Sequence, residues 1–201
     1  MGVREAQKLA TRRRVLDAAS DLFNEIGFED ATVRAIANRA GVSVGSVFTT
    51  FTSKADILNQ VMQDRLEALY EEAGRFIPLM RGSTADRCRS LFAVLYAFET
   101  RRVKLFLAHI AVAYRWDMEP TARPFGANQV FRDLMAQWLK EGVERGDLRA
   151  DIDIPAVVDL LLGLYAWNYR LAPSENADAE RLTQVMDQQI GMVFEGLRPQ
   201  G

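Results

Sequence analysis

Residues 32–58, TVRAIANRAGVSVGSVFTTFTSKADIL, decide the fold of this chain. Apolar residues recur at three- and four-residue spacing up to Ala40, and Gly41 then stands where a helix is expected to end. Thr32 and Ser43 each carry a hydroxyl that can cap a following helix. The segment therefore predicts two short helices joined by a three-residue turn, which are the proportions of a helix-turn-helix.

The second short helix is expected to have two unlike faces. Val47 and Phe51 lie one turn apart and are predicted to face inward. The outer side then holds small or weakly polar residues and one aromatic ring: Val44, Gly45, Ser46, Phe48 and Thr49. A glycine inside so short a helix costs about 1 kcal/mol of helix propensity, but its missing side chain lets the backbone approach a partner closely. Such a surface suits the major groove of DNA.

Helical periodicity continues on both sides of this segment, and no alternation typical of strands is found. The apolar positions from Val15 to Ile26 predict a first helix, and Ser53 to Asp56 has the spacing of a capping box that opens a long fourth helix. Further helices are predicted near 85–100, 102–115, 125–145, 155–171 and 180–197. We therefore predict an all-α chain of about nine helices, with a DNA-binding domain over 1–55 and a second domain over 56–201.

The predicted helix 155–171 is apolar almost all round, because Asp159 is the only charged residue between Ile154 and Tyr169. It is shorter than the ~20 residues that a membrane span needs. A helix of this kind has to be buried on nearly every side, and a domain of this size is unlikely to cover it alone. The pattern predicts that a partner subunit supplies the remaining cover.

Composition favours a soluble globular protein, with 49% hydrophobic and 26% charged residues and a net charge of -2. One cysteine and one histidine leave no disulfide framework and no zinc cluster. We therefore expect no metal and no cofactor. The N-terminus lacks an apolar stretch, which indicates a cytoplasmic protein without a membrane anchor.

A basic run precedes the first apolar stripe. Arg4, Lys8 and residues 12–14 are opposed only by Glu5. Such an arm often contacts phosphates, and a solvated, frayed N-terminus is the equally strong alternative.

The segment from 11 to 58 resembles the DNA-binding domain of the TetR family of bacterial repressors. The matching residues are Thr32, Ile36, Ala37, Ala40, Gly41, Val42, Ser43, Gly45, Phe51, Lys54 and, one place late, Leu58. Phe48 departs from the pattern, which usually has tyrosine there. The resemblance implies a dimeric DNA-binding repressor that holds a near-palindromic operator and releases it when a small-molecule effector binds the second domain.

Carried over to this chain, the resemblance implies specific DNA contacts. Arg34 is expected to read a base edge, unless it is only a solvated surface residue. Four residues are expected at phosphates: Thr32, Ser43, Thr50 and Lys54. For Thr32 and Ser43, the alternative explanation is their structural role as helix caps. Val44, Ser46 and Thr49 are expected to press methyl groups on thymine or to form short hydrogen bonds.

The second domain resembles the family only in length and helix content. Eight residues are predicted to line an effector pocket: Phe92, Tyr96, Phe106, His109, Trp116, Trp138, Tyr165 and Trp167. The alternative is that most of them are ordinary core and that His109 is a satisfied core or surface histidine. The dimer contact is predicted at Leu161, Leu164, Leu182, Met186, Ile190, Val193 and Leu197.

Two other functions stay open at this point. Residues 41–45 spell G-x-S-x-G, the nucleophile elbow of esterases, but that motif needs a preceding strand, and His109 is the only available base. A helical dimer that has lost its operator is the second alternative, for which Phe48 leaves some room.

Overall fold

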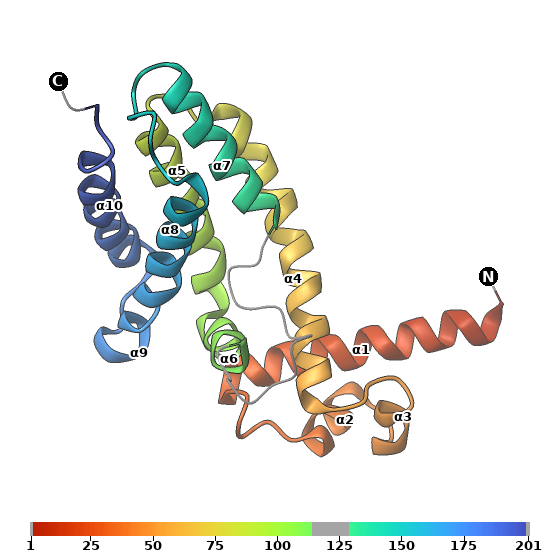
Figure 1. Cartoon of the computed structure of the whole chain (residues 1–201). Helices are drawn as coiled ribbons and strands as arrows, with labels where there is room; N and C mark the ends of the chain where they lie inside the picture. Colours follow the sequence, from red (N-terminus) through yellow and green to blue (C-terminus); the bar gives the residue numbers. More distant parts are fainter. Residues whose placement is uncertain (1, 114–128, 200–201) are drawn as a thin grey trace. The chain divides into compact units, whose positions relative to one another are not determined.

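The computed structural model describes residues 2–113 and 129–199 (Figure 1). Within these ranges the chain is helical and has no strand, which confirms the predicted all-α class. The α-helices are α1 (Val3–Ile26), α2 (Val33–Ala40), α3 (Val44–Phe48), α4 (Lys54–Phe76), α5 (Thr84–Glu99), α6 (Val103–Ala113), α7 (Gln129–Glu144), α8 (Ile154–Asn168), α9 (Leu171–Glu175) and α10 (Ala179–Glu195). Two 3-10 helices, η1 (Ile77–Leu79) and η2 (Thr100–Arg102), join α4 to α5 and α5 to α6.

The helices follow the predicted series closely, with one addition and one early start. The short α9 was not predicted as a helix of its own. The first helix begins at Val3, because residues 4–10 are all strong helix formers and Glu5 places a negative charge in the first turn. None of the helices in the described ranges is long and apolar enough to cross a membrane.

Two compact units make up the chain. The first unit holds the residues up to Tyr70 together with the segment from Arg102 that carries α6. The second unit holds Glu71–Arg101 and the C-terminal helices from α7 onward. The division therefore falls within α4, whereas the boundary predicted from the sequence lies between residues 55 and 56.

The first unit is built on α1, which packs against α2 and α6. Its core contains the fully buried side chains of Phe23, Ile36 and Val47. Arg102 forms an ion pair with Asp21 on α1, with 2.8 Å between the guanidinium and carboxylate atoms. Packing within this unit holds α2 and α3 in a fixed position relative to α1.

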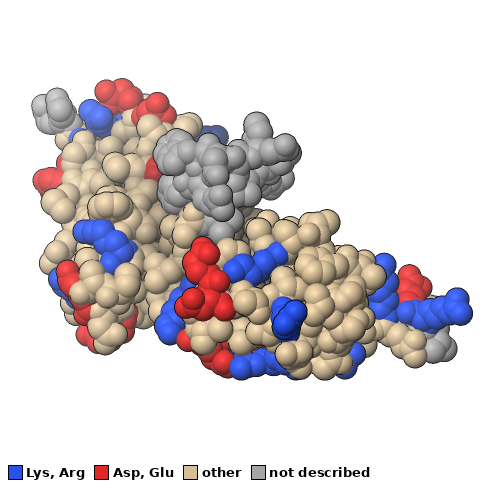
Figure 2. Space-filling view, turned by 90° about the horizontal axis from the view of Figure 1, so that it is seen from below, with Lys and Arg blue, Asp and Glu red and all other residues tan. Residues whose placement is uncertain are grey.

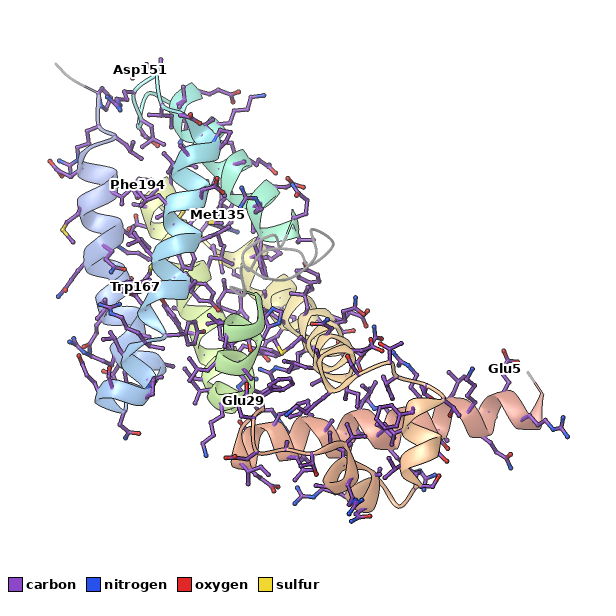
Figure 3. All side chains as sticks on the ribbon, turned by 60° about the horizontal axis from the view of Figure 1, so that its bottom comes forward. Glu5, Glu29, Met135, Asp151, Trp167 and Phe194 are labelled. Carbon is purple, nitrogen blue, oxygen red and sulfur yellow. The ribbon has the colours of Figure 1, made fainter. Side chains whose placement is uncertain are left out.

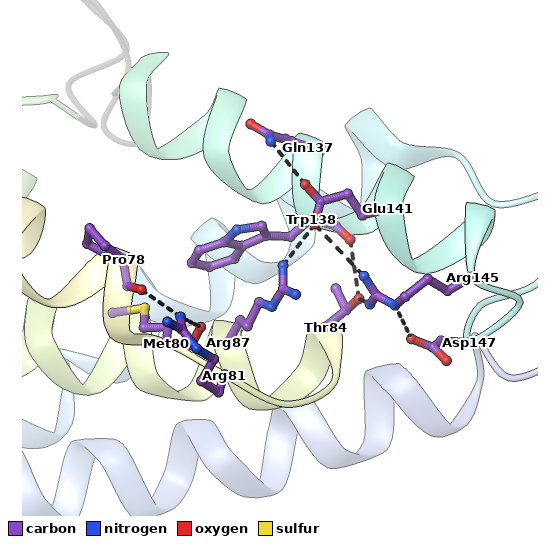
Figure 4. Close-up of polar contacts among 10 residues, drawn as sticks. All are labelled: Pro78, Met80, Arg81, Thr84, Arg87, Gln137, Trp138, Glu141, Arg145 and Asp147. Carbon is purple, nitrogen blue, oxygen red and sulfur yellow. Dashed lines mark hydrogen bonds and ion pairs between the residues drawn. The ribbon is translucent and has the colours of Figure 1, made fainter.

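The second unit is centred on α5, which packs against both α7 and α10, while α8 contacts the same two helices. A close approach between α5 and α7 depends on Gly142, because a Cβ atom there would lie 2.5 Å from Thr84 Oγ1. The buried Thr84 hydroxyl donates to the carbonyl of Trp138 and accepts from Arg145, and Arg87 pairs with Glu141 nearby (Figure 4). Packing and paired charges together fix the start of α5 on the C-terminal half of α7.

Candidate nucleic-acid interface

The turn between α2 and α3 has the hydrogen bonds expected of a helix-turn-helix. Thr32 Oγ1 accepts from the Ala35 amide at 3.1 Å and so caps α2. Gly41 ends that helix in the left-handed backbone region at φ 65°, where residues other than glycine are strained. Ser43 Oγ accepts from the Ser46 amide at 3.1 Å and caps α3. The predicted helix ends and caps are confirmed.

The two faces of α3 are also as predicted. Val47 and Phe51 are buried in the first unit, whereas Phe48 is 55% exposed. Gly45 and Thr49 are exposed as well, while Val44, Ser46 and Thr50 are half-buried. The exposed ring of Phe48 leaves apolar surface in contact with water, which makes this side of α3 a candidate surface for contact with a partner molecule.

Hydroxyl groups on α3 are partly engaged within the helix itself. Ser43 Oγ and Ser46 Oγ lie 2.8 Å apart, and Thr49 Oγ1 donates to the Ser46 carbonyl at 2.7 Å. The Thr49 hydroxyl proton is therefore used inside the helix, which leaves its methyl group and oxygen lone pairs for an outside partner. Methyl contact is accordingly the stronger of the two contacts predicted for this residue.

Gly45 has no packing reason to be a glycine. A Cβ atom placed there would meet only Ser43 Oγ, at an ordinary 3.8 Å. Its backbone is helical, so no unusual dihedral angle requires glycine either. The protein itself therefore has space for a side chain at this position.

Arg34 and Arg39 on α2 differ in their surroundings. The Arg39 guanidinium pairs with the carboxylate of Glu25 at 2.7 Å. Arg34 is exposed, and the described residues offer it no ion pair or side-chain hydrogen bond. Its guanidinium is therefore available for a bidentate contact, as predicted from the sequence.

Lys54 differs from the sequence-based prediction of a phosphate contact. Its ammonium donates to the carbonyl oxygens of Phe28 at 2.6 Å and Glu29 at 3.2 Å, and it lies 4.3 Å from the centre of the Phe28 ring. The lysine thus fastens the loop between α1 and α2 to the start of α4. The structure therefore gives Lys54 a structural role, and its predicted phosphate contact stays a prediction.

The surface seen from below carries basic residues on both flanks of the first unit and around a largely uncharged area (Figure 2). Acidic residues gather at one side of this unit, beside basic ones. This distribution leaves a face where phosphates meet little repulsion.

Residues 15–61 match the family model of the bacterial regulatory proteins of the tetR family. This segment is therefore a DNA-binding domain of the tetR type. The matched helix-turn-helix makes the chain a DNA-binding transcriptional regulator. Ser43 caps a helix and is preceded by helix α2, so the strand that a nucleophile elbow needs is absent from this place and the esterase reading is wrong.

Among curated proteins, the chain is 28% identical to the HTH-type transcriptional repressor KstR2 of Rhodococcus jostii, with 94% of this chain and 92% of that protein covered. It is 26% identical to the regulator BetI of Escherichia coli, over 74% of this chain and 78% of BetI. Among solved structures it is similar to the repressor FadR of Thermus thermophilus in complex with lauroyl-CoA, with a TM-score of 0.69, 27% identity, and coverage of 94% of this chain and 96% of FadR.

The second unit brings together only some of the predicted pocket residues. Phe92, Tyr96 and Tyr165 are buried side by side, with ring centroids 5.5 Å apart for Phe92 and Tyr165 and 4.8 Å apart for the two tyrosines. Tyr169, which was not among the predicted pocket residues, completes the group at 5.3 Å from both tyrosine rings. Its spacing of four residues from Tyr165 on a predicted helix was the signal that could have identified it.

A buried polar network runs through this aromatic cluster. Asn168 and Gln189 exchange two amide hydrogen bonds of 2.7 and 3.1 Å between α8 and α10. Asn168 also donates to Tyr96 Oη at 3.2 Å, and that hydroxyl donates to the Tyr165 carbonyl. Burial raises the pKa of Tyr96 and of Tyr169, so both hydroxyls remain protonated donors at neutral pH.

The other predicted pocket residues lie elsewhere. Trp167 is 63% exposed on α8, so its assignment to the pocket is wrong (Figure 3). Trp138 is buried on α7, and its carbonyl accepts from Thr84. Phe106 and His109 belong to α6 in the first unit, with ring centroids 6.4 Å apart. Burial lowers the pKa of His109 to about 4, and Trp116 lies outside the described residues.

Most of the predicted dimer residues are part of the chain's own core. Leu161, Leu182, Met186 and Ile190 are fully buried within the second unit, and Leu197 is also buried. Leu164 and Val193 are half-buried. We correct the assignment for the five buried residues, because a side chain already covered by its own helices has no surface left for a partner. The large apolar residues exposed on these helices are Leu160, Trp167 and Met192.

Proposed function

We propose that this chain is an effector-released transcriptional repressor that holds a near-palindromic operator as a homodimer in the cytoplasm. The observation that carries the proposal is the outward face of α3. Phe48 is exposed on this face, and packing within the protein does not require the glycine at position 45, while Val47 on the other face is buried. In a dimer, two such helices about 34 to 36 Å apart enter successive turns of the major groove.

DNA readout rests on few groups. Arg34, which has no partner within the described protein, would form a bidentate contact to the O6 and N7 atoms of guanine. Thr32 stands at the start of α2, where a hydroxyl and free backbone amides favour a phosphate. Ser43 and Thr50 would contact phosphates beside α3. Because long polar side chains are scarce on α3, the shape of the DNA would contribute to specificity.

Dimerisation is proposed on the exposed faces of α8 and α10. Exposed positions on α8 follow the spacing of a helical seam: Ala156, Leu160, Gly163 and Trp167. Leu160 and Trp167 are 49% and 63% exposed, and Met192 on α10 is 69% exposed. Large apolar side chains alternating with small ones let a second pair of helices pack closely, so a four-helix contact with a second copy supplies the cover that α8 lacks.

The effector site is proposed at the aromatic cluster of Phe92, Tyr96 and Tyr165, where apolar rings surround the hydroxyls of buried tyrosines. An effector that is mostly apolar, with one or a few polar groups, fits this chemistry. The FadR structure of T. thermophilus contains lauroyl-CoA, which makes a fatty acyl thioester the first compound to test. Preferential binding to a conformation with lower operator affinity would release the DNA.

The test begins with selection of bound genomic fragments by the purified protein, followed by footprinting of the recovered site. We expect a near-palindromic footprint, and Arg34→Ala should relax discrimination at one base pair in each half-site while Arg39→Ala should not. Titration with lauroyl-CoA should release the operator if the effector class is right. Equal retention of random and genomic DNA would instead support a helical dimer without an operator.

A further inference from the structure

Apart from Arg65, the cations among the described residues of the first unit fall into two groups. Arg12 donates to Gln60, Arg13 pairs with Asp17 and Asp64, and the remaining members of the first group bond to α1 or its following loop. These remaining members are Arg39, Lys54, Arg102 and Lys104. By contrast, the described residues place no carboxylate against Arg4, Lys8, Arg14 or Arg34. Three of these four cations lie on α1, before its first buried residue.

The first turns of α1 are helical although they pack against nothing in the described structure. Residues 4–10 are exposed, and Val15 is the first buried side chain of the helix. Figures 1 and 3 both show this end of α1 projecting beyond α3, and Figure 3 labels Glu5 near the tip. Since the segment contributes no burial to the fold, packing within the unit does not explain why it carries these cations.

The direction of the cations follows from helix geometry. Arg4 and Lys8 precede Val15 by eleven and seven residues, spacings that place all three on one face of α1. Val15 faces the core of the unit, so the two cations continue the core-facing side of α1 past the end of the packed helices. Arg14 is beside the turn of the helix-turn-helix, because its Nη1 lies 3.9 Å from the place of a Cβ at Gly41.

Lys8 and Arg4 follow Arg14 along α1 away from the turn, and Arg14 is turned by about 100° from the face that holds the other two. At about 1.5 Å of rise per residue, Lys8 lies roughly 9 Å and Arg4 roughly 15 Å beyond Arg14 along the helix axis. These distances along the axis exceed the separation of neighbouring phosphates on one DNA strand, so the three cations together can contact more than one phosphate. A helix holds its side-chain roots in place, which lowers the entropy lost on binding compared with a disordered arm.

We propose that the projecting part of α1 is a phosphate-binding arm, in which Arg4 and Lys8 contact the DNA backbone outside the half-site held by α2 and α3. The inference rests on the proposed operator binding and extends it to flanking DNA. It makes affinity depend on the length of the duplex and on salt, without adding base specificity.

The test compares Arg4→Gln/Lys8→Gln with a control that removes two exposed cations of the second unit, Lys140→Gln/Arg198→Gln. Glutamine retains the helix propensity of lysine and arginine, and unchanged circular dichroism would verify the fold of both variants. On a selected operator with ten flanking base pairs on each side, the arm variant should bind about tenfold or more weakly at low salt. Its salt dependence should fall by up to about two ions per subunit, whereas the control should keep the wild-type value.

Duplex length separates this inference from the proposed function. Trimming the flanks should weaken the wild type to the level of the arm variant and leave the arm variant almost unchanged. If the wild type binds the operator but the arm variant has the same affinity and salt slope, the proposed phosphate-binding arm is wrong and operator binding stands. If the wild type selects no operator, the proposed function fails and the arm with it.

Discussion

The ammonium of Lys54 donates to the carbonyl oxygen of Phe28 at 2.6 Å and stands over the ring of the same residue. One side chain at the start of α4 thus satisfies the backbone of the loop that leads from α1 to α2. The contact explains why a lysine is useful here, although a positive charge at a helix N-terminus opposes the helix dipole.

Lys54→Met should therefore act on stability. Loss of hydrogen bonds from a charged donor lowers the free energy of unfolding by about 1.5 to 3 kcal/mol, measurable by urea denaturation. The salt slope of operator binding should stay at the wild-type value. A variant of normal stability whose slope falls by about one ion per subunit would restore the phosphate contact predicted from the sequence.

Gly45→Ala should separate folding from DNA binding. The added methyl group meets no close atom within the protein, and alanine gains up to about 1 kcal/mol of helix propensity. Thermal unfolding should therefore occur at the same or a higher temperature, while operator affinity falls because the backbone is held away from the DNA. An alanine variant with full affinity would show that no partner comes close to α3 at this point.

Phe48→Tyr should tighten operator binding. The side chain is exposed on the outer face of α3, and a tyrosine hydroxyl there can donate to a phosphate oxygen. Such a bond contributes about 1.5 to 3 kcal/mol, or about tenfold or more in affinity. Titration of labelled operator at several salt concentrations would measure the gain, and the slope should not change because no charge is added. Unchanged affinity would mean that the DNA does not pass in front of residue 48.

Leu160 and Leu161 are neighbours with opposite surroundings, which makes them a matched pair. Leu161→Arg should unfold the second unit, because it buries an unpaired charge at a cost of several kcal/mol. Leu160→Arg should leave the fold intact and yield monomers, as measured by circular dichroism and light scattering. A dimer of unchanged mass in folded Leu160→Arg would exclude this face of α8 from the interface.

Acid should destabilise the first unit through His109. Burial lowers the pKa of His109 in the folded chain from its ordinary value of 6.5 to about 4, so between these values the unfolded chain binds a proton that the folded chain does not. Stability is therefore retained above pH 6.5 and lost as the pH falls toward 4. His109→Gln should flatten this part of the stability profile. Equal slopes for both proteins between pH 4 and 6.5 would contradict the burial of this imidazole.

The parts of the fold that depend on neighbouring residues were predicted from the sequence. Thr32 and Ser43 cap their helices through amides three residues on, and the inward spacing of Val47 and Phe51 is a property of one helix. The role of Lys54 depends on Phe28, which is 26 residues away, and no local pattern reveals such a contact.

The face of α8 was predicted wrongly for a different reason. With apolar residues on every side, periodicity cannot distinguish the side that meets α7 and α10 from the side left open. The sequence places Leu161 at the interface and Trp167 in the pocket, whereas the structure buries Leu161 and exposes Trp167.

The reciprocal amide pair of Asn168 and Gln189 limits how α8 and α10 can move. Sliding one helix by a turn along the other would break both bonds and leave the buried amide of Asn168 without this partner, which is unfavourable. We therefore expect the two helices to move together as one rigid body. Tyr96 is coupled to them through its hydrogen bond with Asn168. A disturbance at that tyrosine would tilt the pair as a whole, so the proposed subunit contact would respond by reorienting while keeping its register.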